Sequence, residues 1–128
     1  MMPRHLTHLA AALALAVTIG PANAETTSPD PYVPAGEPVD CLQLRSIQST
    51  SVRDDQTIDF VTNGRKIYRN VLPNSCPSLG FERRFSYKTS LSQLCSVDMI
   101  TVLYSGPGLQ SGASCGLGKF QPMEKAAK

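Results

Sequence analysis

The sequence predicts an all-β fold, a small antiparallel barrel or sandwich of five to six strands with two disulfides. Three observations predict it: apolar and polar residues alternate over several short runs, an Asn-Gly pair separates two of these runs, and the chain has four cysteines. The length of 128 residues fits one such domain. A net charge of +2, from 12 basic and 10 acidic residues, is too small to indicate nucleic acid or an anionic membrane as the partner.

Residues 1–24 have the pattern of a secretory signal peptide. Arg4 supplies the positive charge, residues 9–20 form an apolar run, and Ala22-Asn23-Ala24 is a small-residue cleavage site, so we expect Glu25 to begin the mature chain. The apolar run is shorter than the roughly 20 residues that cross a bilayer, and no membrane span is expected. We therefore expect a periplasmic or secreted protein.

Both histidines of the chain, His5 and His8, lie in that segment. The expected mature chain has no histidine and cannot form a Ser-His-Asp triad or a histidine zinc site. This composition favours a protein that is not an enzyme and carries no cofactor.

A proline-rich leader is predicted over residues 25–39, a single β domain over 40–122 and a polar tail over 123–128. Prolines fix extended backbone and keep the leader out of helices and central strands. The leader has four of them, Pro29, Pro31, Pro34 and Pro38.

The first predicted strand, Leu42–Val52, is rich in β-branched residues, and a β-bulge near Arg45-Ser46 would explain a slip in its alternation. Asp54-Asp55-Gln56 forms the turn that follows. Residues 57–61 alternate again and make the second strand.

The pair Asn63-Gly64 predicts a hairpin, because both central positions of a type I′ turn need positive φ. This two-residue turn pairs Phe60 with Ile67. A three-residue bulged loop that begins one residue earlier is the alternative and places Ile58 beside Tyr68, since a one-residue slip exchanges the two faces of a strand.

Three further strands and one short helix are expected. Phe81, Phe85 and Tyr87 share one face of a strand, Met99–Tyr104 is a central strand, and 115–120 is an edge strand. One helical turn is expected at 91–95. The predicted core consists of six apolar residues: Ile58, Phe60, Ile67, Phe85, Ile100 and Val102.

The four cysteines predict two disulfides in an oxidising compartment, because their spacing includes no C-x-x-C pair for a metal. Three connectivities are possible. We predict Cys41 with Cys115, because parallel closure of the first and last strands would bring these residues into register. Cys76 then pairs with Cys95 through a chain reversal near Thr89-Ser90.

Motifs spread over residues 41–121 resemble a family of small exported proteobacterial proteins, a domain of unknown function. The resemblance implies export and a shared disulfide-bonded domain, but no activity or site residue. It is carried by the following motifs: Ile58-x-Phe60, Tyr68-Arg69-Asn70-x-Leu72, Cys76-Pro77-x-Leu79, Phe85-x-Tyr87, Leu94-Cys95-x-x-Asp98-x-Ile100 and Cys115-Gly116-Leu117-Gly118-x-Phe120, together with Cys41 and the Asp54-Asp55 turn.

Four carboxylates, Asp54, Asp55, Asp59 and Asp98, are candidates for acid–base chemistry in a small carboxylate-based hydrolase. Turn formation and solvation explain them better, so we expect alanine at Asp59 or Asp98 to affect folding or binding and not turnover. Ser90 and Lys88 are a weak candidate for a Ser-Lys dyad.

Two other patterns partly match known binding motifs. Gly118-Lys119 matches only the end of a phosphate-binding loop, because Ala113 and Phe120 replace the required residues. Basic residues interleave with aromatic ones, but solvated strand faces explain this pattern without nucleic acid. The basic residues are Arg65, Lys66, Arg69, Arg83, Arg84 and Lys88, and the aromatic ones are Tyr68, Phe85 and Tyr87.

The sequence thus favours a non-catalytic exported module, monomeric, that binds an envelope macromolecule or protein or has a structural role. Its specific form is a hydrolase inhibitor with Ser105–Ser114 as the inserting loop. The small hydrolase is the alternative.

Overall fold

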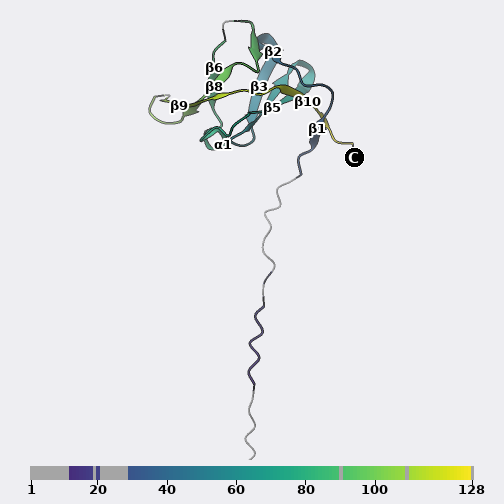
Figure 1. The fold of residues 1–128 in the computed structure, drawn as a ribbon, viewed down its shortest axis with the longest axis vertical. Coiled ribbons are helices and arrows are strands. Elements are labelled where there is room, and N and C mark those ends of the chain that lie inside the picture. The colour runs from purple at the N-terminus through teal and green to yellow at the C-terminus, as the bar shows by residue number, and fades with distance from the viewer. Residues whose placement is uncertain (1–11, 19, 21–28, 90, 109, 128) are drawn as a thin grey trace, which may run out of the picture.

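The computed structural model describes residues 12–18, 20, 29–89, 91–108 and 110–127, which include ten short strands and one helix (Figure 1). The helix is α1 (Leu79–Glu82). The strands are β1 (Tyr32–Pro34), β2 (Cys41–Gln43), β3 (Ile47–Val52), β4 (Thr57–Thr62), β5 (Lys66–Val71), β6 (Phe85–Tyr87), β7 (Gln93–Cys95), β8 (Met99–Tyr104), β9 (Gln110–Gly116) and β10 (Phe120–Lys125).

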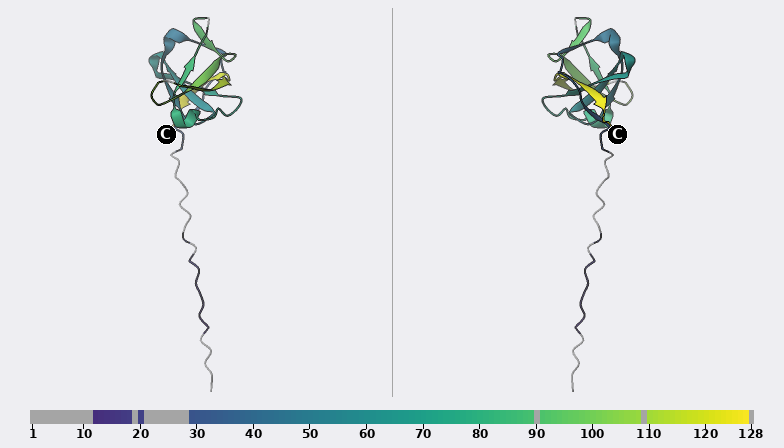
Figure 2. Two further views of the ribbon diagram at one scale, coloured as in Figure 1. Left: turned by 90° about the vertical axis from the view of Figure 1, so that its left-hand side faces the viewer. Right: turned by 90° about the vertical axis from the view of Figure 1, so that its right-hand side faces the viewer.

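These strands form three antiparallel sheets, with the orders β1-β10-β5-β4-β3, β2-β7 and β6-β8-β9. The views in Figure 2 show the sheets folded around one common interior. The all-β prediction with two disulfides is confirmed, although the fold is not a single barrel. The strands outnumber the predicted five to six for two reasons. A 3-10 turn at Leu44–Ser46 divides the first predicted strand, where a bulge was expected, and the last one is divided between β9 and β10. In addition, β1 and β7 form in segments that were predicted to be leader and helix.

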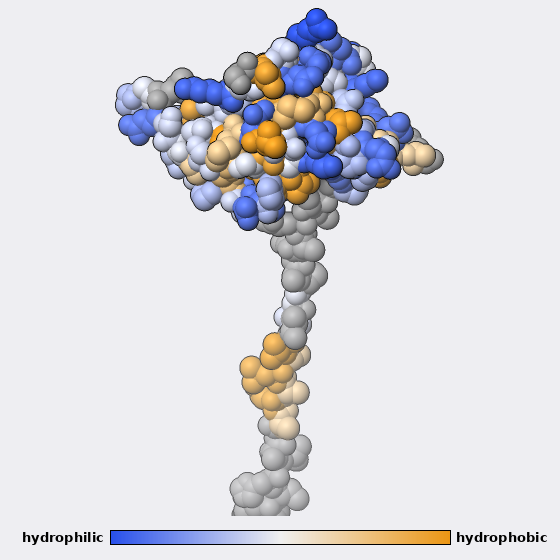
Figure 3. All heavy atoms as spheres, turned by 45° about the horizontal axis from the view of Figure 1, so that its top comes forward, coloured by the Kyte–Doolittle hydropathy of each residue, from blue (hydrophilic) through white to orange (hydrophobic). Residues whose placement is uncertain are grey.

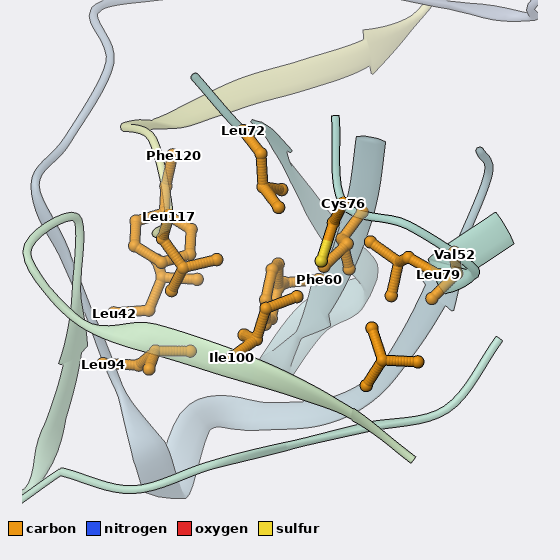
Figure 4. Packing of buried hydrophobic residues seen from close by; sticks show 12 residues of the cluster. Leu42, Val52, Phe60, Leu72, Cys76, Leu79, Leu94, Ile100, Leu117 and Phe120 are labelled. Atoms are coloured by element: carbon orange, nitrogen blue, oxygen red, sulfur yellow. The ribbon is translucent and has the colours of Figure 1, made fainter. Parts of the chain in front are cut away.

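One apolar cluster fills the interior (Figure 4). Ile58, Phe60, Ile100 and Val102 are fully buried, as predicted, and Phe85 packs edge-on against Phe60. The cluster also includes residues from most of the other elements: Leu42, Val52, Leu72, Cys76, Leu79, Leu94, Leu117 and Phe120.

Both predicted registers of the β4–β5 hairpin are wrong. Phe60 pairs with Tyr68, and the loop is Asn63–Arg65, because Gly64 (φ 76°) and Arg65 (φ 59°) adopt the left-handed region, and not Asn63. Ile67 consequently pairs with Val61 on the face away from the core, so its predicted place in the core is also wrong.

The predicted disulfide pairing is wrong as well. Cys41 is bonded to Cys95, and Cys76 to Cys115. The predicted first strand, 42–52, does not close in parallel beside the predicted last strand, 115–120. Instead β2 pairs antiparallel with β7, which puts Cys41 opposite Cys95, while Cys115 lies beside Ile100.

Two predicted elements between residues 79 and 95 are corrected. Phe81 is not in a strand with Phe85 but in helix α1, and the segment predicted to be helical ends in strand β7. Phe81, Phe85 and Tyr87 have the even spacing of one strand face, but Arg83 (φ 55°) adopts a left-handed conformation and breaks the strand.

The first and last strands of the structure lie side by side in the five-stranded sheet. β1, from the predicted leader, pairs with β10, and Val39 forms a bridge with Phe120. The predicted edge strand 115–120 is divided between β9 and β10, and the predicted tail, 123–128, begins inside β10.

Figure 3 shows apolar residues grouped between hydrophilic ones on one face of the domain, and a second apolar group on the extended N-terminal segment. Leu13, Leu15 and Val17 of that segment are exposed. No helix in the described part of the chain has the length and apolar character needed to span a membrane.

Candidate binding surface

Four charged side chains form a network on the side of the five-stranded sheet that faces away from the core. Asp59 on β4 is 4% exposed and accepts bonds from Arg69 Nε (2.8 Å), Arg69 Nη2 (3.0 Å) and Arg53 Nη1 (3.0 Å). Asp30 pairs with both arginines, at 3.5 Å from Arg53 Nη2. Asp59 is thus an internal anchor of the sheet, and Arg69 is not the solvated basic residue that the sequence suggested.

Electrostatics in this network favour the charged forms. The Arg69 side chain and the Tyr32 N–H donate bonds to Asp30, which hold the pKa of that carboxyl below its ordinary value. Bonding to Asp59 raises the pKa of Arg69 above its ordinary value.

The other candidate carboxylates also bond to nearby backbone. Asp54 accepts the Gln56 N–H (2.8 Å), and Asp98 accepts the Cys95 N–H (2.7 Å). Asp98 and Asp54 line different surface hollows. No group of three potential metal ligands occurs among the residues that the structure describes.

The remaining sequence candidates divide between core and surface. Tyr68 and Tyr87 pack against the core. Gly118 bonds on both sides to the buried Asn70 amide, at 2.7 and 2.8 Å, which places it in the packed fold. Ser90, of the proposed pair with Lys88, lies outside the described residues.

All eight phenylalanine and tyrosine residues lie in the described part of the chain, and among them only Phe81 is exposed, at 86% of its surface. It lies on helix α1, whose Leu79 is fully buried in the core. We call residues 76–84 the Phe81 turn. Leu79 thus anchors helix α1 to the core, while the ring of Phe81, two residues later, stays exposed to water.

Covalent and hydrogen bonds brace the Phe81 turn. Cys76 is buried, bonded to Cys115 and donates its N–H to Asp55 O (2.7 Å). The Asp55 side chain accepts the Gly80 N–H at 2.7 Å. A Cβ at Gly80 would lie 3.0 Å from the backbone of Asp54 and Asp55, so the turn fits closely against that loop.

Both ends of α1 carry left-handed residues other than glycine. Ser78 has φ 68° and Arg83 has φ 55°. Such conformations cost of order 1–3 kcal/mol each, persist only where the surroundings impose them, and cluster at functional sites. The backbone of the Phe81 turn is therefore strained on both sides of its exposed ring.

A second exposed segment is tied to the same turn. Glu82 accepts bonds from the N–H and Oγ of Ser105, both at 3.2 Å, at the start of the loop between β8 and β9. Ser105–Gly108 is exposed, whereas the rest of the predicted inserting loop begins strand β9 at Gln110. Arg83 and Arg84 are also exposed, and neither forms a salt bridge within the described residues.

No family model, curated protein or solved structure matches this chain. The resemblance to a family of exported proteins stays a prediction.

Sequence reasoning missed Phe81 as a surface residue because an aromatic residue in a period-two run predicts a buried strand position. The sequence nevertheless contains a signal for a turn at this position. Pro77 and Gly80 surround Leu79, and such a sequence is more typical of a turn than of the start of a strand.

Proposed function

We propose that this protein is a non-catalytic, exported binding module that docks on a partner protein through the Phe81 turn. The observation that carries the proposal is the 86% exposure of Phe81 on a turn braced by a disulfide. Two disulfides support an oxidising, extracytoplasmic location, since such bonds form and persist there.

Burial of the Phe81 side chain in a partner would contribute about 1.5–3 kcal/mol. Aromatic side chains dominate the energetics of many interfaces. A braced turn loses little conformational freedom on binding, so more of that gain remains as affinity.

Charge narrows the choice of partner. Arg83 and Arg84 are the exposed last residues of the Phe81 turn, and the Ser105–Gly108 loop is joined to the turn through Glu82. A complementary surface has an apolar pocket bordered by carboxylates. The cleft of a carboxylate-based hydrolase has this chemistry, and inhibition of such an enzyme is the specific form of the proposal.

Photo-crosslinking tests the docking surface. A benzophenone amino acid replaces Phe81 in one protein and Val97, which is 87% exposed, in the control. Exposure to an envelope extract of the native host should give one crosslinked partner at position 81 and none at position 97. The same product from both positions, or none from position 81, contradicts the proposal.

The purified partner then permits a quantitative test. Phe81→Ala should weaken binding at least tenfold, about 1.4 kcal/mol, and Arg83→Glu should weaken it further in low salt. Val97→Ala should leave the affinity unchanged. If the partner is a hydrolase, the wild-type protein should inhibit it stoichiometrically.

The hydrolase alternative has no specific support. Asp54, Asp55, Asp59 and Asp98 each accept a hydrogen bond that holds local structure.

A further inference from the structure

A row of apolar side chains crosses the face of the five-stranded sheet that points away from the core. Pro34 on β1 pairs with Met123 on β10, Met123 with Ile67 on β5, and Ile67 with Val61 on β4. Paired residues share a face, so these four side chains are neighbours on one surface.

Met123, Ile67 and Val61 of this row form the floor of a groove with a volume of about 560 Å³, which Tyr32 also lines. This volume is within the roughly 300–1,000 Å³ typical of small-ligand sites. Met123 is only 9% exposed and Ile67 and Val61 are half-buried, so the apolar atoms line a depression and do not protrude.

The rim of the groove is predominantly cationic. Arg65, Lys66 and Lys125 line it, against one carboxylate, Glu124. Within the described chain none of the three cations forms a salt bridge. Two further arginines on the same face are neutralised by Asp59 and Asp30, so unpaired positive charge is concentrated at the groove.

We propose that this groove binds a single-chain anionic amphiphile, a long-chain alkyl carboxylate. The alkyl chain lies along Met123, Ile67 and Val61, and the carboxylate meets Arg65 and Lys125. A free chain fits a recessed floor, whereas attachment to a bilayer surface needs apolar side chains that protrude. The site is independent of the Phe81 turn, which lies in other elements of the fold.

Displacement of a fluorescent fatty acid measures the binding. Dansyl-labelled undecanoate is the probe, and dodecanoate, decanoate and octanoate compete below their micellar concentrations. Each methylene lost from the competitor should weaken binding by up to about fourfold, because each contributes apolar contact with the floor. Dodecanol, with the same chain and no charge, should bind at least tenfold more weakly than dodecanoate.

Variants locate the site. Ile67→Glu should weaken dodecanoate binding at least tenfold, by placing a carboxylate on the floor. Val71→Glu is the matched control: Val71 lies on the same strand and face but outside the groove and is 54% exposed, so this change should alter binding less than twofold. The double change Arg65→Gln and Lys125→Gln should abolish the preference for dodecanoate over dodecanol.

Three results would overturn the proposal: no displaceable binding of the probe, equal loss in Ile67→Glu and Val71→Glu, or binding to phosphatidylglycerol vesicles without binding of monomeric dodecanoate. Circular dichroism confirms that each variant is folded. Phe81→Ala should leave fatty-acid binding unchanged, so failure of this site and failure of the docking surface are distinguishable.

Discussion

The five-stranded sheet and the two smaller sheets are stabilised in different ways. The large sheet has four strands of six residues and no cysteine, and the ion pairs of Asp59 tie its central strands together. In the smaller sheets β2, β6 and β7 have only three residues each, whereas β8 and β9 are long, and these sheets contain Cys41, Cys95 and Cys115. One disulfide thus crosses the shortest sheet, β2–β7, and the other ties β9 to the segment before helix α1.

The largest expected effect comes from removal of the buried disulfide. The double change Cys76→Ala and Cys115→Ala should lower the free energy of unfolding by about 4 kcal/mol, since the bond closes a loop of 39 residues and its loss leaves space in the core. Urea unfolding measures this change. Hydrogen exchange should show faster opening of β6, β8 and β9 than of β4 and β5, and equal opening would contradict the comparison.

The large sheet should respond instead to loss of its buried charge. Asp59→Asn leaves Arg69, whose side chain is 14% exposed, without its strongest partner. This change should lower the free energy of unfolding, measured in urea, by about 3 kcal/mol. Asp40→Asn is the control, because its pair with Lys119 is exposed and such pairs contribute about 0–1 kcal/mol. Comparable losses of unfolding free energy in Asp59→Asn and Asp40→Asn would show that Asp59 does not act as an anchor.

Acid should weaken the attachment of the leader to the large sheet. The pKa of Asp30 is lower in the folded protein than its ordinary value of 3.8, so its stabilising contribution is complete above that value and is lost as pH falls further. We expect the wild type to be more stable than Asp30→Asn at pH 6 and the difference to vanish as pH falls well below 3.8. A stability difference between wild type and Asp30→Asn that persists in acid would show that ionisation of Asp30 does not stabilise the fold.

The smallest expected effect is at Phe81. Phe81→Ser should change the free energy of unfolding by no more than about 0.5 kcal/mol, because the ring makes little contact with the core. A loss similar to that for a buried phenylalanine, about 3–5 kcal/mol, would mean that the ring is structural. Thermal unfolding of this variant beside Phe60→Ala distinguishes the two cases.

The sequence predicts strands best where one strong period covers the whole element. Residues 57–61 and 99–104 are correctly assigned because their apolar patterns extend over five or six residues. Sequence reasoning fails where the outcome depends on a distant partner. The disulfides follow from the pairing of β2 with β7, and no local pattern encodes that pairing.

The candidate surfaces illustrate the same limit. Arg83 and Arg84 are visible in the sequence as basic residues beside aromatic ones, but their position next to an exposed Phe81 depends on a left-handed backbone at Arg83. The groove is harder to foresee, since it needs β10, partly from the supposed tail, to pair with β5 at Ile67 and β1 from the leader to pair with β10.

The three-residue loop Asn63–Arg65 determines which face of β5 is turned outward. Substitutions along β5 can change the character of the groove, but the loss or gain of a single loop residue would exchange its two faces. Ile67 would then enter the interior, and the buried Asn70 would turn to water. The length of this hairpin, and not only its composition, thus decides whether the chain has an apolar binding surface, and an insertion or deletion in it should be far less tolerated than one in the Ser105–Gly108 loop.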